Sequence, residues 1–427
     1  MKILIGILLV CISLKLNAQD TIRMMQYNLL DYNYYNTYCT ASNNLEADKD
    51  QDIRQIVQYV KPDIFTMCEM GANTLNPQHL MDSALNVNGV SYYQKANYTN
   101  FSGSDIVNML YYNSIKLSLL SQAIIVNGIR DINMYKLYYN DPNLSTTHDT
   151  AFFICIIAHL KAGSTSTDQS DRAATTSDIM TYIVNNNITG NVMIMGDFNV
   201  QASSETCFQN LIGYADTTKR FHDPINKLGT WNNNSTFAAY HTQSTSSAGD
   251  GCKASSGLDD RFDFILTTGS ILNGSQKVHY VPGTYHAVGQ DGNHFNQSVN
   301  GSPTNTSVPS NVLTALADNS DHLPVTMKLV VNQIGAGVQT PSNNIENLIV
   351  NNPVNNILYF SGRIKKPAKL NLQVFSLLGQ LMIQRELSVN NEYFNDQISF
   401  DQLKNGLYFL VLSDENGQQI TKKIIKQ

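Results

Sequence analysis

The sequence is poor in cysteine, and its few cysteines are not arranged as metal ligands or as a disulfide framework. Six occur in 427 residues. A set this sparse excludes a small disulfide-stabilised domain, and no pair has zinc-ligand spacing. One bridge can form, although none is required. Cys207 and Cys252 fall in polar, loop-like sequence and are the pair we expect, whereas Cys68 and Cys155 lie in apolar runs and are expected to be buried thiols.

Long apolar runs are also missing, apart from one near the N-terminus. Residues 1–18 begin with Lys2, continue through an apolar run and close on Asn17 and Ala18, which is typical of a secretory signal peptide. A membrane span is the alternative, but the run is short for a bilayer, and no other stretch approaches about 20 apolar residues. We therefore expect a secreted chain without a stable membrane span, starting near Gln19.

Positive charge is scarce in most of the chain. Residues 19–350 hold 17 Lys and Arg against 28 Asp and Glu, a net charge of −11, whereas residues 351–427 hold 9 against 6, a net of +3. An acidic body repels a polyanion unless bound divalent cations or a local basic patch reverse the field at the site. Net charge alone therefore argues mildly against a nucleic-acid partner.

The chain does contain many short β-rich runs separated by polar segments. They include IRMMQYNLL, DIFTMCEM, IVNMLYYN, AFFICIIAHL and NVMIMGDFNV. Apolar residues at helical spacing predict helices over residues 50–60 and 171–184. Residues 285–311 are rich in Gly, Asn, Ser, Thr and Pro and are expected to form a long surface loop. The pattern predicts a layered α/β protein.

The length of the chain indicates more than one folding unit. The aperiodic segment NQIGAGVQTPSNNIE follows the β-rich body, and the residues after it alternate apolar and polar side chains between turn signals, which predicts a small β-sandwich. We expect a signal peptide over residues 1–18, a body over 19–332, a linker over 333–350 and a C-terminal β-domain over 351–427.

Polar clusters stand at the ends of five apolar strands. They are Asn28, Glu69, His159, Asp197 with Asn199, and Asp321 with His322. Taken singly, each has an ordinary explanation, since Asn and Asp cap turns and a histidine at a strand end is usually just hydrogen-bonded. Together they supply a carboxylate and an amide for a hard cation, further carboxylates for proton transfer, and imidazoles beside a phosphate. The set is typical of phosphodiester hydrolysis.

These motifs resemble those of the endonuclease/exonuclease/phosphatase family, which includes deoxyribonuclease I, abasic-site endonucleases and bacterial sphingomyelinases. The resemblance runs in order through about residues 21–330. Its elements are MQYN with Asn28, CEM with Glu69, AHLKAG with His159, MGDFNV with Asp197 and Asn199, RFDFIL with Asp263, and SDHLPV with Asp321 and His322. It implies a four-layer sandwich, two mostly antiparallel sheets flanked by helices, with the site at one sheet edge.

The resemblance also implies a metal site. Glu69 and Asn28, with help from Asp321, would hold Mg²⁺ or Mn²⁺ against a phosphate oxygen, where the ion neutralises charge that grows in the transition state. Ca²⁺ is a further candidate ion. Arg130 and Lys161 are weaker candidates for contact with the substrate phosphate, and each can equally be an ordinary surface charge.

The same resemblance implies roles for the remaining residues. His322 would donate to the phosphate or help to activate water, with its tautomer fixed by Asp263. Asp197 would orient or deprotonate the attacking water, and Asn199 would point its amide at the phosphate. His159 matches the deoxyribonuclease and sphingomyelinase branches, in which it is a candidate to protonate the leaving oxygen. Which group acts as the base stays open.

The other histidines are not spaced as a zinc pair, so loop or surface positions are expected for them. They are His79, His148, His222, His241, His279, His286 and His294. His241 follows a strand in polar sequence and is a candidate for lining a substrate groove, with a purely structural position as the alternative.

The last segment resembles the C-terminal sorting domain of the type IX secretion system. The resemblance rests on NPV at its start, VFSLLGQ, LKNGLYFLVL and the basic KKIIKQ end. It implies export through the periplasm of a Gram-negative bacterium, contact with the secretion machinery, and release or attachment at the cell surface. A carbohydrate-binding or adhesive β-module is the alternative, but the segment has no Trp for a binding face.

The sequence thus predicts a secreted, divalent-metal-dependent phosphodiesterase, with a nuclease acting on DNA or RNA as the leading hypothesis. A sphingomyelinase-like enzyme would need an exposed apolar hairpin to reach lipid, and the only tryptophan, Trp231, lies in polar sequence. A hydrolase of small phosphoesters and a non-catalytic surface-displayed binding protein are further alternatives. Because no candidate site residue is missing, the last of these is disfavoured. Oligomeric state cannot be read from the sequence.

Overall fold

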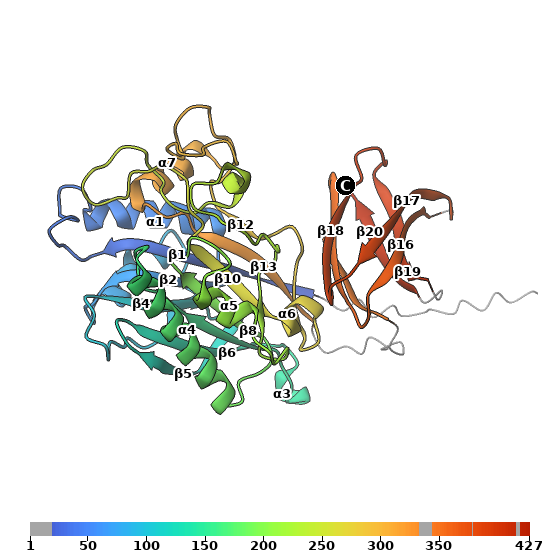
Figure 1. The fold of residues 1–427 in the computed structure, drawn as a ribbon, viewed down its shortest axis with the longest axis horizontal. Coiled ribbons are helices and arrows are strands. Elements are labelled where there is room, and N and C mark those ends of the chain that lie inside the picture. The colour runs from blue at the N-terminus through green and yellow to red at the C-terminus, as the bar shows by residue number, and fades with distance from the viewer. Residues whose placement is uncertain (1–18, 333–343, 378, 416–418) are drawn as a thin grey trace, which may run out of the picture.

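The structure is a computed structural model that describes residues 19–332, 344–377, 379–415 and 419–427 (Figure 1). The expected signal peptide, residues 1–18, and most of the expected linker lie outside the described residues. Within the described part, a body of two β-sheets and several helices is followed by a C-terminal unit made of strands. No helix in these ranges is long and apolar enough to cross a membrane.

The first sheet of the body has seven strands among the described residues, and β1 (Gln19–Tyr32) lies at its centre. The strand order is β11-β13-β1-β2-β4-β3, with β12 paired to β13. β1 runs parallel to β2 and antiparallel to β13. The other strands are β2 (Ile64–Gly71), β3 (Tyr93–Lys95), β4 (Ile106–Asn113), β11 (Val278–Tyr280), β12 (His286–Ala287) and β13 (Val325–Asn332).

The second sheet has the order β5-β6-β7-β8-β10-β9. Its pairs are antiparallel, apart from the parallel pair β7 and β8. The strands are β5 (Leu117–Asn127), β6 (Asp131–Tyr139), β7 (Phe152–Ile157), β8 (Val192–Asp197), β9 (Phe221–His222) and β10 (Asp263–Thr268). The predicted pair of mostly antiparallel sheets is therefore confirmed.

The two sheets pack face to face, and helices cover their outer faces (Figure 1). Apolar residues of α1 (Glu46–Val60) and α7 (Ser310–Asn319) form a core with the first sheet, and those of α4 (Ser166–Asn185) and α5 (Thr206–Ile212) form one with the second. This is the four-layer sandwich that the motifs implied. Shorter helices are α2 (Asn76–Leu80), η1 (Met81–Leu85), α3 (Leu144–Thr147), η2 (Ser235–Tyr240) and α6 (Gly269–Asn273).

Both predicted helices are present, and both begin earlier than their apolar periodicity suggested. α4 starts at Ser166 because Thr165 and Asp168 form a capping box, in which each side chain bonds the other residue's backbone N–H. α1 starts at Glu46, and its first turn carries acidic side chains that suit the positive end of the helix dipole. Polar first turns carry no apolar periodicity, so the pattern detects only the part of a helix that faces the core.

Residues 285–311 differ from the expected surface loop. They contain little regular structure, but Val299, His294 and Asn305 are buried within them. The amide of Asn305 donates to the carbonyls of Gly289 (2.7 Å) and Val299 (3.0 Å), so the segment folds back on itself. Its polar residues satisfy backbone groups inside the protein, which a composition rich in Asn, Ser and Gly does not reveal.

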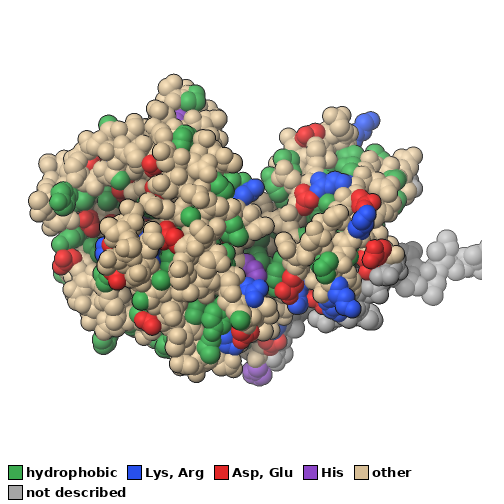
Figure 2. All heavy atoms as spheres, in the orientation of Figure 1, with side chains coloured by type: hydrophobic (Ala, Val, Ile, Leu, Met, Phe, Trp, Pro, Cys, Tyr) green, Lys and Arg blue, Asp and Glu red, His purple; other side chains and the backbone are tan. Residues whose placement is uncertain are grey.

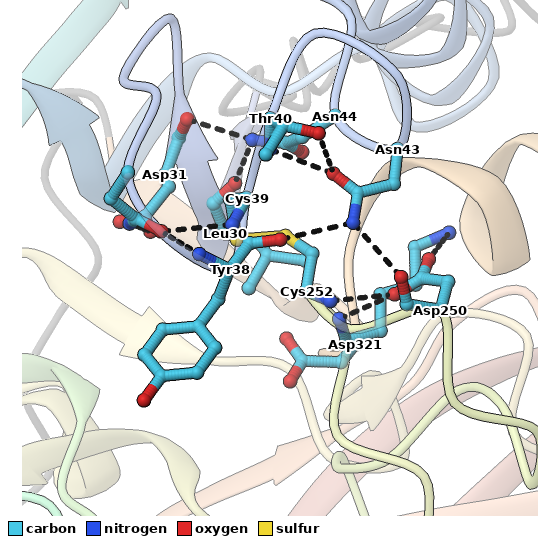
Figure 3. Close-up of a disulfide and its surroundings, with 12 residues drawn as sticks. Leu30, Asp31, Tyr38, Cys39, Thr40, Asn43, Asn44, Asp250, Cys252 and Asp321 are labelled. Atoms are coloured by element: carbon cyan, nitrogen blue, oxygen red, sulfur yellow. Dashed lines mark hydrogen bonds and ion pairs between the residues drawn. A yellow bond between two sulfur atoms is a disulfide. The ribbon is translucent and has the colours of Figure 1, made fainter.

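The expected disulfide between Cys207 and Cys252 is wrong. Cys252 is bonded to Cys39 instead (Figure 3), whereas Cys207 is a buried free thiol on the inner face of α5. The bond joins the loop after β1 to the loop that precedes β10. Cys68 and Cys155 are buried free thiols, as predicted.

Removing this bond should lower the free energy of unfolding by about 2–4 kcal/mol, because it closes a long loop in the unfolded chain. The bonded residues are 213 positions apart. Urea titrations of the wild type and of the Cys39→Ser/Cys252→Ser double variant, each with and without reductant, measure this difference. Reductant should bring the wild type to the stability of the variant and leave the variant unchanged. Equal stability without reductant would contradict the prediction.

The C-terminal unit is a small β-sandwich, as predicted. One sheet has the order β14-β15-β18 and the other β17-β16-β19-β20, with an apolar core between them. The strands are β14 (Ile345–Val350), β15 (Ile357–Ile364), β16 (Ala368–Ser376), β17 (Leu381–Val389), β18 (Tyr393–Ser399), β19 (Gly406–Asp414) and β20 (Gln419–Lys426). β14 lies within the range expected to be a linker and pairs with β15.

The sandwich contacts the body through β18. The ring of Tyr393 packs against that of His222 with centroids 4.9 Å apart, and the amide of Asn395 donates to the Pro224 carbonyl at 3.1 Å. On the face shown in Figure 2, Lys and Arg side chains gather on the sandwich and are few on the body. This agrees with the opposite net charges of the two parts.

Candidate active site

Two parallel strand pairs bring polar side chains to one edge of the body. β1 and β2 are paired with Asn28 opposite Cys68, so Glu69 stands one residue further along. β7 and β8 are parallel as well. His159 lies just beyond the carboxyl end of β7, and Asp197 is the last residue of β8. Because the ends of parallel strands meet at the same edge, four of the predicted site residues come from four neighbouring strand ends.

Two antiparallel strands begin at the same edge and add the remaining groups. β10 starts with Asp263, which is directly opposite Asp197 on β8. Asp321 and His322 immediately precede β13, which pairs with β1. The Ser320 hydroxyl ties this segment to β1 by donating to the Asn28 carbonyl at 2.8 Å.

Local backbone irregularities aim two of the carboxylates. Glu69 has a φ of 59° where the pairing of β2 with β4 shifts register, so its side chain leaves the regular alternation of the strand. Gly196 has a φ of 143°, and a Cβ at this position would collide with the Ala158 carbonyl oxygen. Only glycine therefore lets β8 approach the segment after β7 this closely just before Asp197.

The centre of the site is a cluster of amide, carboxylate and imidazole groups. The Asn28 amide donates to Glu69 Oε1 at 2.9 Å and to Asp197 Oδ2 at 3.0 Å. His159 Nε2 lies 3.5 Å from the same Glu69 oxygen and 3.7 Å from the same Asp197 oxygen. One ligand atom from each of Glu69, His159 and Asp197 lies within 4.8 Å of the others.

A second imidazole faces this cluster from the other side of Asp197. His322 Nδ1 donates to Asp263 Oδ2 at 2.7 Å, and the Thr242 hydroxyl donates to the same oxygen at 2.7 Å. His322 Nε2 lies 3.7 Å from Asp197 Oδ2 and 3.9 Å from Asp321 Oδ1. The ring is therefore oriented by Asp263, and its other nitrogen points into the cluster, where the two carboxylates nearest to it in the described part of the chain lie beyond hydrogen-bond distance.

Burial and mutual charge shift the pKa values of these groups. Burial raises the pKa of Asp197 to about 7, and the carboxylates of Asp263 and Glu69 act in the same direction. Burial also raises the pKa of Glu69. Burial lowers the pKa of His322, but the carboxylates of Asp263 and Asp197 outweigh it and hold the pKa well above its usual value. The pKa of His159 lies well below its usual value, mainly because of burial.

The donor set suits a hard divalent cation. The carboxylates of the buried Asp197 and the partly buried Glu69 lie close together, and repulsion between them is relieved by a positive ion. Asp321 Oδ1 is buried and has no hydrogen-bond donor among the described residues. A buried carboxylate oxygen left in this way is costly unless a cation or a water reaches it. The residues present therefore fit Mg²⁺ or Mn²⁺.

Asp321 and Asn199, two further predicted site residues, are held by hydrogen bonds at the edge of the cluster. Asp321 Oδ2 accepts from the Ala254 backbone at 3.0 Å. The Asn199 backbone donates to Asp197 Oδ1 at 2.9 Å, but its side-chain amide is directed to the Leu160 carbonyl at 3.3 Å. Asn199 thus supports Asp197 from behind, and its amide is engaged within the protein.

The two weaker candidates for contact with the substrate phosphate, Arg130 and Lys161, have different surroundings. Arg130 donates to the Leu160 carbonyl at 3.4 Å, and its charge lowers the pKa of His159, so it lies beside the cluster. Lys161 pairs with Asp168 at 2.9 Å and is therefore engaged at the start of α4. His241 is fully buried, with its ring nitrogens 3.2 and 2.9 Å from backbone carbonyl oxygens, which is a structural position.

Several residues that support the site were not expected. The Asp31 backbone donates to Glu69 Oε2 at 3.2 Å, and Thr242 holds Asp263. The buried Lys49 ammonium donates to Asn44 Oδ1 (2.8 Å) and the Asn319 carbonyl (2.5 Å), linking the turn after β1 to the segment before β13. The sequence offered a signal for Asp31, because it closely follows Asn28, a predicted site residue. A lysine on a helix has no sequence signal for burial.

Known structures similar to this chain include members of the endonuclease/exonuclease/phosphatase family. D. rerio TDP2 complexed with single strand DNA product is 12% identical, and the match covers 72% of this chain and 98% of that one, with a TM-score of 0.45. The human Nocturnin catalytic domain with bound sulfate anion is 13% identical over 73% and 97%, with a TM-score of 0.43. An endonuclease/exonuclease/phosphatase from Bacteroides vulgatus is 15% identical over 73% and 99%, with a TM-score of 0.45. At this level of similarity, the chemistry of the site must be inferred from its own geometry.

The C-terminal unit has a match of its own. Residues 351–427 match the family described as "Secretion system C-terminal sorting domain". This confirms the predicted sorting domain and indicates secretion or attachment at the cell surface. No curated protein matches the chain.

Proposed function

We propose that the body, residues 19–332, is a divalent-cation-dependent phosphodiester hydrolase and that its substrate is nucleic acid. The observation that carries this proposal is the buried His322–Asp263 pair, whose free ring nitrogen faces Asp197 beside a carboxylate and amide cluster. Such a cluster offers places for a cation, a phosphate and an attacking water at once.

The cation would be held by Glu69 and Asp321, with Asn28 contributing its side-chain oxygen, which also accepts from the Leu30 backbone at 2.9 Å. When bound, it neutralises the charge that develops on the phosphate and helps to orient the phosphate for attack. Asn28 already hydrogen-bonds Glu69 and Asp197, so its amide sets the spacing of the two carboxylates.

The proton-transfer groups flank this position. Asp263 holds the His322 ring so that Nε2 can donate to a phosphate oxygen or contact the attacking water. Asp197 lies between the two imidazoles, within 3.7 Å of each, and is the carboxylate we assign to orient the water and accept its proton. His159, on the other side of Asp197, is assigned to the leaving oxygen.

Support for a nucleic-acid substrate comes from the surroundings of His159. Arg130 lies beside it, and its guanidinium donates to a backbone carbonyl, that of Leu160 at 3.4 Å, rather than to a carboxylate. An arginine in this state can bind a phosphate of the substrate backbone. It also supplies a local positive charge on an acidic body. The C-terminal sandwich would direct the enzyme to the secretion machinery, after removal of residues 1–18 as a signal peptide.

Replacing Glu69 with glutamine should remove most of the cation-dependent activity. Loss of one charged ligand should lower cleavage by about 10²-fold or more at a fixed Mg²⁺ concentration and raise the Mg²⁺ concentration needed for half activity. The measurement is hydrolysis of plasmid DNA, RNA and sphingomyelin by the secreted full chain with Mg²⁺, Mn²⁺, Ca²⁺ or EDTA.

Glu386→Gln is the matched control, because this carboxylate lies on the sandwich and is 63% exposed. It should behave as the wild type. Cleavage of DNA or RNA that persists in EDTA would contradict cation dependence. Turnover of sphingomyelin alone would move the assignment to a lipid phosphodiesterase, and inactivity on DNA, RNA and sphingomyelin alike would oppose the proposed substrate.

A further inference from the structure

Most of the large apolar side chains that stand almost fully in solvent lie at the edge that carries the site. Those at least 70% exposed among the described residues are Tyr38 (72%), Leu75 (71%), Phe101 (75%) and Ile115 (70%). The first three lie in the segments after β1, after β2 and before β4, at the end of the first sheet where Asn28 and Glu69 stand. Single exposed apolar residues are ordinary, but their concentration around one edge is a feature of a binding surface.

The backbone that carries the Tyr38 ring is fixed. Tyr38 N–H donates to Asn36 Oδ1 at 2.8 Å, its carbonyl accepts from the Asn43 amide at 3.0 Å, and the next residue is the disulfide-bonded Cys39. Figure 3 shows the Tyr38 ring and the Asp321 carboxylate beside this same disulfide. The backbone beneath the ring is thus held next to the site by three separate restraints, so little backbone ordering entropy remains to be lost when a ligand packs on the ring.

The Tyr38 loop is also connected directly to the cluster. The Asn36 amide donates to Asp31 Oδ2 at 2.7 Å, and the Asp31 backbone donates to Glu69 Oε2 at 3.2 Å. A continuous set of hydrogen bonds therefore runs from the expected cation ligand to the residue that holds Tyr38. The backbone position of Tyr38 is therefore linked through hydrogen bonds to the position of Glu69.

Phe101 is held in an equivalent way on the other side. The backbone N–H groups of Phe101 and Ser102 donate to the two oxygens of Asp131, at 2.7 and 2.8 Å. Asp131 follows Arg130, the arginine that lies beside His159. The loop that contains Cys252 is tied to the segment before β13, because the Ala254 backbone donates to Asp321 Oδ2 at 3.0 Å. In the strand order β13-β1-β2-β4-β3, Tyr38 is therefore tied towards the β13 side, and Phe101 lies in the segment that joins β3 to β4. The strand end that bears Glu69 lies between them.

We propose that Tyr38 and Phe101 stack nucleobases on either side of the cleaved phosphate, so that the substrate is single-stranded nucleic acid; this rests on the proposed function. Bases have flat faces that stack on aromatic rings whatever their sequence, and they are free to do so when the strand is unpaired. Arg130 contacts the backbone on the Phe101 side.

The surroundings of the two rings disfavour a lipid surface as the occupant. Tyr38 stands among Asn36, Thr37 and Asn43, and Phe101 between Asn100 and Ser102. Loops that enter a membrane interface present a continuous apolar face, because their polar groups cannot be desolvated without partners. A ring whose sequence neighbours carry amides and hydroxyls suits a water-filled groove, in which the face of a nucleobase supplies the apolar surface that packs on the ring.

The test compares a single-stranded oligonucleotide with an abasic oligomer of the same length and backbone, using the full chain with Mg²⁺. Tyr38→Ala and Phe101→Ala should each raise KM for the base-bearing oligomer by about 5- to 100-fold, with kcat little changed, since stacking binds substrate and transition state alike. Neither should change cleavage of the abasic oligomer. Tyr38→Trp should keep the wild-type KM.

Tyr59→Ala is the matched control, because this ring is 43% exposed near the end of α1, away from the site edge. If the variants cleaved the base-bearing oligomer as well as the wild type does, base stacking would be overturned, while the phosphodiesterase proposal would stand. Failure of the wild type to cleave either oligomer would instead count against the proposed function. Binding to sphingomyelin vesicles that is lost in Tyr38→Ala would overturn the inference in favour of a lipid surface.

Discussion

Replacing His322 with alanine should lower kcat for nucleic-acid cleavage by about 10²- to 10⁴-fold, the range typical of a lost proton-transfer group. The His322 ring is buried, and it lies between Asp263, which it contacts at 2.7 Å, and Asp197, at 3.7 Å. Its removal takes away the only imidazole held by a carboxylate on that side of the cluster among the described residues. Because the ring acts on the reacting phosphate or water, KM should change far less than kcat. Single-turnover cleavage of an oligonucleotide measures the chemical step.

The control for this prediction is His294→Ala. His294 is also buried and paired with an aspartate, at 2.9 Å from Asp291, but it lies in the 285–311 segment and bonds the Pro303 carbonyl. Its loss should lower stability without a comparable fall in kcat. If folded His322→Ala retained kcat within a few-fold of the wild type, the assigned role of His322 would be wrong. Asp263→Asn, which keeps the shape but not the charge, should fall between the two.

Replacing Arg261 with methionine should reduce the free energy of unfolding by about 3–5 kcal/mol, because it leaves a buried carboxylate without its positively charged partner. The Arg261 guanidinium donates to both oxygens of Asp223, at 2.9 Å each, and neither side chain is more than 1% exposed. The guanidinium also lies 4.5 Å from the centroid of the Phe264 ring, so part of the stabilisation is packing. Urea denaturation of the single variant measures the loss.

A double variant separates charge from packing. Arg261→Met/Asp223→Leu removes both charges, and it should recover much of the lost stability because no unpaired carboxylate remains buried. Arg220→Met is the matched control, since Arg220 is partly exposed and donates to backbone carbonyls rather than to a carboxylate. It should change stability by less than about 1 kcal/mol. A single variant as stable as Arg220→Met would contradict a structural role for the Arg261–Asp223 pair.

Local sequence patterns predicted the parts of the site that are themselves local. Asn28, Glu69, His159 and Asp197 each end or directly follow an apolar strand, and such a junction is visible in a few residues of sequence. Their meeting then follows from two parallel strand pairs, whose carboxyl ends share an edge. The pairing of His322 with Asp263 could be expected only from the family resemblance, because it joins residues 59 positions apart.

Other features were beyond the reach of sequence because they depend on how distant segments approach each other. The loop-like sequence around a cysteine does not show whether Cys39 or Cys207 forms the disulfide with Cys252. The partner is determined by which of the two lies next to Cys252 in the folded protein. The sequence around Lys49 predicts a solvated helix residue, yet its contact with Asn319 at the end of α7 lies in the interior, and Lys49 is buried. The positive φ of Glu69 has no signal in the residue type, because glutamate rarely adopts that conformation.

The pairing of β1 with β13 also determines which way the site faces. Gln19, where β1 begins, is opposite Asn332, where β13 ends, and both lie at the end of the sheet remote from Asn28 and His322. The sorting domain follows that rear end in the chain, and Figure 1 shows it on that side of the body. A cell envelope that held the protein by its sorting domain would therefore meet the rear of the body. The edge that carries the candidate site would point outward into the medium, where a large substrate could reach it without steric hindrance from the cell surface.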